Sequence, residues 1–309
     1  MYDTTTRHRR FARAARESRP DLALLCLLIA TEARAARAGV DTATLDAGPD
    51  GTVDGTADDA VEDAAPDPDE QRIDAAQIEL DRLTGMLPAL GRGAEPRQWA
   101  EALAALLGER CGFHGLPADY RRLESSLLDE VLQRRRGLPI LLSVVWLEVA
   151  RRAGAPVYGV ALPGHFVVGF GDPHGRHVLA DPFDGGRILS EEEAGLLVAG
   201  ATGAPLAPSM FSPADPLEIV LRVLNNIRAW AAARPERSDV QLWAVELSLL
   251  LPSHPAQLRY ERAELLVERG DFARGARELE EYASVIAALE PSVAETVRHQ
   301  ALAARAMLN

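Results

Sequence analysis

Two side chains in the middle of the chain have the types and the order of a catalytic pair. His165 lies in the stretch LPGHFVVGF, and Asp181 follows it in the stretch ADPFDGG. A carboxylate beside an imidazole fixes the ring tautomer and stabilises the charged imidazolium. We expect the two residues on adjacent antiparallel strands, where they would form an Asp–His pair. Asp184, in the same stretch as Asp181, is expected to be a turn residue.

A nucleophile for this pair is harder to find. A cysteine at a helix start is activated by the helix dipole and a facing histidine, but the expected first turn at residues 138–140 reads Leu-Pro-Ile. Cys26 and Cys111 lie elsewhere and are expected to be small apolar core residues. Ser143 is the remaining catalytic candidate on this helix. A hydrogen bond from its hydroxyl back to the carbonyl of Pro139 is the favoured alternative.

Metal binding is another use for the same residue types. His165, His174, His177 and Asp181 could each ligate zinc. No zinc-ligand motif is complete, however, and His174 and His177 are expected to be exposed residues of a hairpin. The chain also has neither GxxxxGK[ST] nor GxGxxG at a strand end. We therefore predict neither a metal nor a cofactor.

The elements around His165 indicate an α+β fold. The helix expected over 138–152 is apolar on nearly every side, which is typical of a helix buried on all sides. The stretches PVYGVALP, HFVVGF and RHVLADPF, rich in Val and aromatic residues, read as strands, with a turn at 172–175. We expect a central helix with a small antiparallel sheet and surrounding helices.

Two helix ends near this core carry local signals. Gly137 is expected to stop the helix before it, and the arginines at 134–136 suit a helix C-terminus on a solvated face. Ser190 and the glutamates that follow it are expected to form a capping box at the start of another helix.

The remainder of the chain is predicted to be helical in two parts. A helical N-terminal part and the core form an expected unit over residues 1–205, with an acidic, disordered insertion at about 40–69. A proline-rich linker separates it from an all-α unit at 216–309. The stretch from Pro255 to Pro291 approaches the length of about 34 residues of a tetratricopeptide repeat. One such unit cannot bury its own face, so it should stack on neighbouring helices.

The amino-acid composition and net charge limit the kinds of partner that the protein is expected to bind. The 309 residues carry a formal net charge of −13, most of it in the Asp-rich segment between Asp41 and Asp74. This balance argues against nucleic acid or an anionic membrane surface as a general partner. No hydrophobic run approaches the roughly 20 residues of a membrane span, and we expect a cytoplasmic protein. The sequence does not indicate an oligomeric state.

A series of motifs resembles the SirB-type transglutaminase-like/tetratricopeptide repeat proteins over roughly residues 75–309. The motifs are GFHG at 112–115, DY at 119–120, SSLLDEVLQRRRGLPILLSVVWLEVARRAG at 125–154, LPGHFVVGF at 162–170, DPFDGGRILSEEE at 181–193 and LRVLNNIRAW at 221–230. The resemblance implies a transglutaminase-like core, related to the cysteine-protease fold, followed by helical repeats.

By this resemblance, His165 and Asp181 match the histidine and aspartate of the transglutaminase triad, whereas the nucleophile position does not match. Members of the family often lack that cysteine. Ser125 stands where the family usually has asparagine. Asn225 and Asn226 match the family's paired amides, and buried amides that bind backbone between the two units would explain them equally well.

Two main hypotheses of function follow. The favoured one is a non-classical transglutaminase-like protein that has lost thiol catalysis and binds a protein or peptide through its cleft and repeats. The competing one is a hydrolase or acyl-transfer enzyme that uses His165 as base, Asp181 to orient it, and Ser143 or water as nucleophile. A weaker third hypothesis is an adaptor in which the repeats do all the binding.

Overall fold

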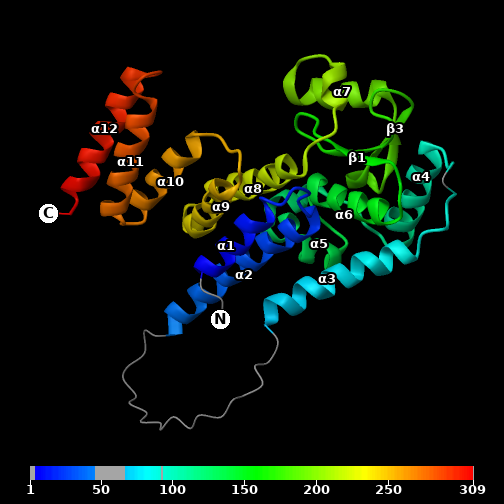
Figure 1. Cartoon of the computed structure of the whole chain (residues 1–309), viewed down its shortest axis with the longest axis horizontal. Helices are drawn as coiled ribbons and strands as arrows, with labels where there is room; N and C mark the ends of the chain where they lie inside the picture. Colours follow the sequence, from blue (N-terminus) through cyan, green and yellow to red (C-terminus); the bar gives the residue numbers. More distant parts are fainter. Residues whose placement is uncertain (1–3, 46–66, 92, 309) are drawn as a thin grey trace, which may run out of the picture.

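The computed structural model describes residues 4–45, 67–91 and 93–308, which form twelve α-helices and one four-stranded sheet (Figure 1). The helices before the sheet are α1 (Thr4–Ala14), α2 (Leu22–Leu45), α3 (Pro68–Gly85), α4 (Pro96–Leu103), α5 (Leu128–Arg134) and α6 (Pro139–Arg152). The helices after it are α7 (Glu191–Thr202), α8 (Pro216–Ala232), α9 (Ser238–Leu250), α10 (Gln257–Glu268), α11 (Phe272–Ile286) and α12 (Pro291–Ala306). The predicted α+β fold class, a central helix with a small antiparallel sheet and surrounding helices, followed by an all-α region, is confirmed.

The sheet is antiparallel throughout and follows the order β1–β2–β3–β4. Its strands are β1 (Val157–Val160), β2 (Val167–Gly171), β3 (His177–Asp181) and β4 (Arg187–Leu189). It lies between α6 on one face and α7 on the other (Figure 1). Alternate side chains of each strand therefore enter different clusters: Ala180 packs with α6, and Leu179 packs with α7.

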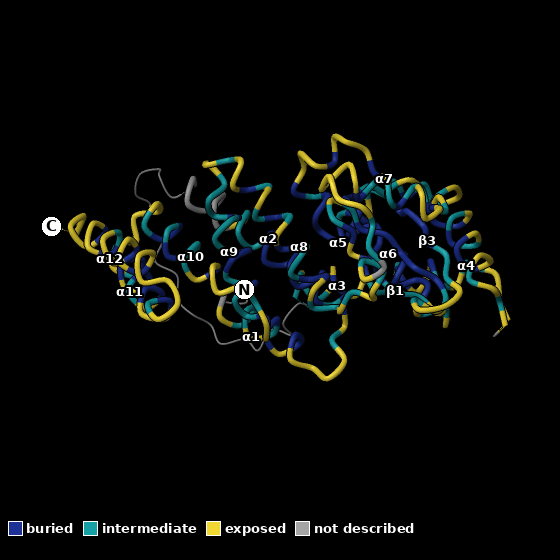
Figure 2. The backbone as a smooth tube through the Cα atoms, turned by 90° about the horizontal axis from the view of Figure 1, so that it is seen from above, coloured by how far each residue is buried: buried dark blue, intermediate teal, exposed yellow. Residues whose placement is uncertain are grey.

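Helix α6 is the centre of the molecule. Proline at its first position suits a helix start, and every residue from Pro139 to Ala150 is buried. The tube is accordingly dark blue through α6 and mostly yellow along α12 (Figure 2). Because close packing surrounds α6 on all sides, the residues of its first turn and the segments that contact them are held in fixed positions.

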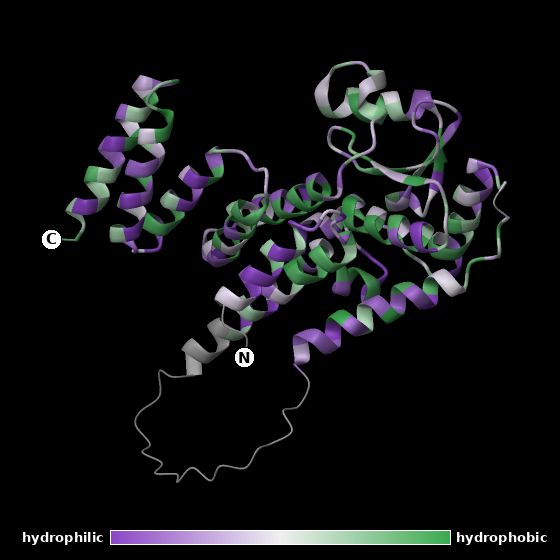
Figure 3. Ribbon diagram, in the orientation of Figure 1, coloured by the Kyte–Doolittle hydropathy of each residue, from purple (hydrophilic) through white to green (hydrophobic). Residues whose placement is uncertain are grey.

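The hydrophobic core of the described residues is divided into four clusters, of which two belong to opposite ends of the molecule. One large cluster joins α1–α6 and the inner face of the sheet to α8 and α9. A second cluster belongs to α10, α11 and α12, which lie at the opposite end of the molecule from the sheet (Figure 1). Hydrophilic and hydrophobic segments alternate along α11 and α12 (Figure 3), as expected for helices with one buried face.

Several element boundaries differ from the prediction. The disordered insertion was expected over about 40–69, but α2 continues to Leu45 and α3 begins at Pro68; residues 46–66 lie outside the described part. Strand β4 was not predicted, because three residues are too few for a recognisable alternation. The second strand begins at Val167, so His165 lies in the turn before it.

The end of α5 also differs. Gly137 was expected to stop this helix, but Arg135 is its C-cap, in the left-handed conformation with φ 58°. The three arginines at 134–136 were expected on a solvated face, and all three are half-buried. By contrast, the predicted capping box at the start of α7 is present, with Ser190 and Glu193 bonded to each other's backbone. Within the described residues, no helix is both long and apolar enough to cross a membrane.

Candidate functional site

The structure brings His165 and Asp181 together. His165 Nε2 lies 2.9 Å from Asp181 Oδ2, and the two side chains are 13% and 7% exposed. Asp181 Oδ1 accepts a hydrogen bond of 2.9 Å from the backbone N–H of Phe183, which holds the carboxylate in place. Hydrogen bonding to a carboxylate favours the tautomer protonated on Nε2. Nδ1 is then the basic nitrogen, and no described residue forms a hydrogen bond with it.

A tight turn before β2 places the His165 ring. Gly164 adopts φ 72°, a conformation that glycine reaches without strain. The backbone N–H of His165 then donates to the carbonyl of Leu162 at 3.2 Å. The turn therefore carries the histidine beyond the end of β2, beside the last residue of β3.

Arg222 on α8 holds the same turn from outside the sheet. Its Nη2 donates to the carbonyl oxygens of Leu162 and His165, at 2.6 and 2.7 Å. Its guanidinium also lies over the ring of Phe166, 5.6 Å from the centroid. Burial lowers the pKa of Arg222. A helix of the C-terminal part thus positions the histidine, and nothing in the local sequence pattern pointed to Arg222.

Two aromatic rings lie beside the pair. The ring of Phe183 meets the His165 ring edge-on at 6.1 Å, and Tyr120 meets Phe183 at 6.0 Å. Burial and then the charge of Asp181 raise the pKa of Tyr120, against the opposing charge of Arg222. The phenol is 52% exposed. It is therefore a neutral hydrogen-bonding group on the exposed surface beside the pair, which we call the entrance.

A buried aspartate supports the loop that carries Tyr120. Asp119 is 2% exposed and accepts hydrogen bonds from the backbone N–H of Leu116 at 2.8 Å and from Arg136 Nε at 3.3 Å. Arg134 and Ser125 approach its other oxygen at 3.5 and 3.4 Å. Two of the three arginines thus neutralise one buried carboxylate, so an ion-pair role replaces the solvated face that the sequence suggested.

The same loop is joined to the start of α6. The carbonyl of Ser125 accepts a hydrogen bond of 2.9 Å from the backbone N–H of Leu138. On the opposite side, the Gly115 N–H donates to the Phe183 carbonyl at 2.9 Å, and a Cβ on Gly115 would lie 1.9 Å from the Phe183 ring. Glycine is required here by the close approach of the ring. The helix start, the loop and the aspartate-bearing turn form one continuous support.

No described thiol or hydroxyl occupies the first turn of α6. Leu138 and Ile140 are buried apolar residues on either side of Pro139. Ser143 is fully buried and donates to the carbonyl of Phe166 at 3.2 Å, not to that of Pro139 as expected. Its hydroxyl therefore ties α6 to the residue after His165. The catalytic roles of His165, Asp181 and Ser143 stay a prediction.

Neither cysteine lies at the helix start. Cys26 is buried in the main core as predicted, and burial followed by the charge of Glu148 raises the pKa of its thiol. Cys111 is only half-buried, in contrast to the prediction of a core residue. A buried, protonated thiol is chemically inert.

The described residues contain no group of three or more His, Cys, Asp or Glu that could hold a metal ion. The four zinc candidates are divided between two places. His165 bonds Asp181, whereas in the β2–β3 hairpin the His174 backbone N–H donates to Asp172 Oδ1 and His177 Nδ1 bonds the Gly175 carbonyl. Asn225 is exposed and accepts a hydrogen bond from Arg228 of the same helix. It does not form the buried link between units that one interpretation required.

Known proteins resemble this chain in sequence. Residues 227–309 match the tetratricopeptide repeat. A UPF0162 protein of Xylella fastidiosa strain 9a5c is 34% identical over 169 residues, which are 52% of this chain and 60% of that protein. A UPF0162 protein of strain Temecula1 is 32% identical over 193 residues, which are 60% of this chain and 68% of that protein. The chain therefore spans about three fifths to two thirds of the length of these relatives.

Among solved structures, one titled "Crystal structure of menin reveals the binding site for Mixed Lineage Leukemia (MLL) protein" is similar over 92% of this chain and 70% of that one, at 12% identity and a TM-score of 0.43. So low a score carries no structural or functional conclusion. The sequence match that covers the site is the decisive one, since it extends over residues 71–225 and includes α6, the sheet, His165 and Asp181. The chain belongs to the Transglutaminase-like superfamily, with UPF0162 proteins among its relatives.

Proposed function

We propose that this chain is a SirB-type protein whose transglutaminase-like core binds a protein or peptide and has lost thiol catalysis. The observation that carries the proposal is the start of α6. Its first turn, residues 138–140, has neither thiol nor hydroxyl, and Ser143 is enclosed and bonded to a backbone carbonyl. The His165–Asp181 pair and its support by Arg222 are nevertheless present. This combination is expected of a site that binds a ligand without attacking it.

The surface proposed for binding combines the entrance to the His165–Asp181 pair with the helical repeats. Tyr120 is half exposed there, and aromatic side chains supply much of the energy at protein interfaces. Helix α8 is attached to both sides of this entrance: Arg222 holds the His165 turn, and Trp230 Nε1 donates to the carbonyl of Arg121 at 2.9 Å. The match to tetratricopeptide repeats also supports a protein partner.

We further propose that residues 1–205 form the transglutaminase-like part and residues 216–309 the repeat part, and that the protein acts in the cytoplasm. The shared attachments of α8 make the two parts one binding unit. A partner that contacts the entrance would therefore also meet the repeat part.

A second candidate function is hydrolysis or acyl transfer, and one observation favours it. His165 Nδ1 forms no hydrogen bond with a described residue, while Asp181 orients the ring through Nε2. Such a nitrogen can take a proton from a water molecule as the water oxygen attacks a carbonyl carbon, and can return that proton to the leaving group as its bond to the carbonyl carbon breaks. Tyr120, a neutral donor nearby, would then contact the substrate.

The two candidates are separated by activity measurements on the full chain. We expect no labelling by fluorophosphonate probes and no turnover of a panel of p-nitrophenyl esters that depends on His165. The comparison uses the wild-type protein, His165→Ala and Ser143→Ala, each checked for folding by circular dichroism. Turnover that is lost in His165→Ala at unchanged stability would replace the binding proposal by the enzymatic one.

The binding proposal has its own positive test. Partners crosslinked to the wild-type protein are identified by mass spectrometry, and the leading one is purified and titrated. We expect Tyr120→Ala to weaken binding about ten-fold or more, since hot-spot aromatics contribute roughly 2 kcal/mol. Ile78→Ala is the control, because Ile78 is 66% exposed on α3. Equal binding by both variants would contradict the proposed surface.

A further inference from the structure

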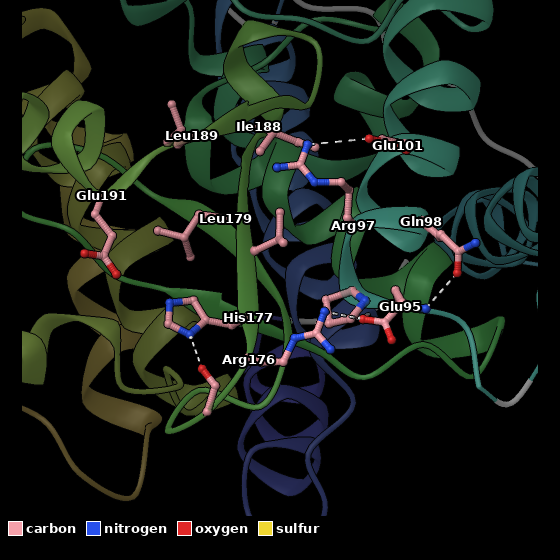
Figure 4. A pocket seen from close by; sticks show the side chains of 13 residues that line it. Glu95, Arg97, Gln98, Glu101, Arg176, His177, Leu179, Ile188, Leu189 and Glu191 are labelled. Carbon is pink, nitrogen blue, oxygen red and sulfur yellow. Dashed lines mark hydrogen bonds and ion pairs between the residues drawn. The ribbon is translucent and has the colours of Figure 1, made fainter.

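A groove of about 630 Å³ lies at the edge of the sheet (Figure 4). It is bounded by the first part of α4, the β2–β3 hairpin, β4 and the first residue of α7. None of the residues that surround His165 lines it. The groove is therefore a second surface that the proposed function does not use.

The groove meets the sheet at its edge. Leu179 and Leu189 belong to the cluster under α7, whereas Val178 and Ile188 pack against the core on the α6 side. All four residues line the groove. A cavity lined by side chains from both faces lies beside the strands and not above one face. Its occupant must approach the sheet edge-on.

The outer edges of the two edge strands, β1 and β4, differ in their backbone pairing. The outer edge of β1 is closed, because Val160 bridges to Pro213 and the N–H of Ala214 donates to the carbonyl of Gly159 at 2.9 Å. Within the described part of the chain, no strand pairs with the outer edge of β4. An unpaired edge presents backbone donors and acceptors that an extended chain can satisfy.

β3 also projects beyond its neighbour on this side. Leu179 pairs with Leu189, the last residue of β4, so that no β4 residue pairs with His177 or Val178. The groove lies at this step. An extended chain is the conformation that fits both the open edge of β4 and the unpaired start of β3.

The charges of the groove select a basic occupant. Arg176 pairs with Glu95 at 2.7 Å, and Arg97 approaches Glu101 at 3.6 Å, so each arginine is already neutralised. Glu191 lies across the groove from these pairs (Figure 4) and forms no hydrogen bond or ion pair with a described residue. The charge left over is a carboxylate, which a lysine or arginine would complement.

We propose that this groove binds an extended segment of a partner protein in which apolar residues alternate with lysine or arginine. The apolar residues enter between the two faces at Leu179 and Ile188, and a basic residue reaches Glu191. The same strand, β3, runs from His177 in the groove to Asp181, about 13 Å away at roughly 3.3 Å per residue. The proposal does not depend on what the His165–Asp181 pair does.

The test uses a fluorescein-labelled peptide, acetyl-KLKVKLK-amide, and fluorescence anisotropy with the full chain. Glu191→Lys is compared with Glu192→Lys, which makes the same charge change in the same helical turn, on a residue that does not line the groove. We expect Glu191→Lys to raise Kd about five-fold or more, the value of one lost exposed ion pair of about 1 kcal/mol. Glu192→Lys should change Kd less than about two-fold, and His165→Ala should not change it.

Three outcomes would overturn the proposal. The first is no binding of the basic peptide, or equal binding of acetyl-ELEVELE-amide. The second is equal weakening by both lysine variants, which would indicate a diffuse charge effect. The third is a dimer, detected by light scattering, that Glu191→Lys dissociates, since a second copy of the chain would then occupy the groove.

Discussion

The two ring nitrogens of His165 have different surroundings. Nε2 is committed to Asp181, while Nδ1 has no hydrogen-bond partner among the described residues. The backbone of the residue is held as firmly as the ring, through Leu162 at its N–H and Arg222 at its carbonyl. A residue fixed at the ring, the N–H and the carbonyl is preorganised, whether it recognises a ligand or accepts a proton.

Substitution of Ser143 distinguishes a binding site from a catalytic site that uses its hydroxyl. Ser143→Ala removes the hydrogen bond to the Phe166 carbonyl, so we expect the free energy of unfolding to fall by about 1 kcal/mol. Binding of the partner should not change. The measurement is urea unfolding followed by circular dichroism, with partner affinity measured on the same samples.

Ser248→Ala is the matched control. Ser248 is also fully buried, and its hydroxyl donates to the Ala244 carbonyl within α9 at 2.7 Å. That carbonyl lies inside a helix and keeps a backbone partner. Ser248→Ala should therefore lower the free energy of unfolding less than Ser143→Ala does. A Ser143→Ala protein with unchanged stability but lost esterase activity would show that the hydroxyl is a nucleophile.

Helices and strands with a local signal were predicted well, and contacts between distant segments were not. The apolar residues of α6 and the capping box of α7 are patterns formed by residues close together in the sequence. Such patterns can be recognised without the structure. β4 was missed because it has only three residues. The contact of His165 with Asp181 was expected from the order of two strands.

The supports of the site carried no such local signal. Arg222 binds backbone carbonyls, which every residue has, and it does so 57 residues along the chain from His165. Asp119 binds Arg134 and Arg136, which lie 15 and 17 residues further along the chain. The three arginines themselves were noticed, but a solvated face and a buried ion pair give the same sequence pattern. Tertiary hydrogen bonds of this kind appear only when the elements are placed in space.

Arg222 provides a test of how α8 controls the site. Arg222→Met keeps much of the side-chain packing and removes the two hydrogen bonds to the turn. We expect the unfolding free energy to fall by roughly 1.5–3 kcal/mol, the range for hydrogen bonds to charged groups. The Nε2 proton signal of His165 should also weaken or shift in NMR spectra, because the ring is less firmly held against Asp181.

Arg228→Met is the control on the same helix. Arg228 pairs with Glu261 of α10 and is not part of the His165 turn. It should leave the His165 signal unchanged even if stability falls. Identical His165 spectra in wild type and Arg222→Met would show that the turn holds itself and that α8 only packs beside it.

The core of the whole molecule does not follow the division between the two proposed parts. α8 and α9 contribute to the same cluster as α6 and α2. The residues of α8 in that cluster are Ile219, Val220, Val223, Leu224, Ile227 and Ala231. α10–α12 reach the remainder through a small cluster that joins Val245 to Leu258 and Leu265. Residues 227–250 therefore match the tetratricopeptide repeat by sequence and belong to the main core by packing, whereas residues 216–225 fall within the transglutaminase-like match.

Truncation separates these two descriptions. A chain of residues 1–256 keeps the main core, and we expect it to unfold cooperatively and to retain the His165 signal. A chain of residues 1–215 loses the buried side chains of α8 at roughly 1.5–3 kcal/mol each, which together approach or exceed the 5–15 kcal/mol of a typical domain. It should show no cooperative thermal transition. A folded 1–215 chain with an ordered His165 would instead mean that the transglutaminase-like part folds alone, and that α8 docks onto a site that is already formed.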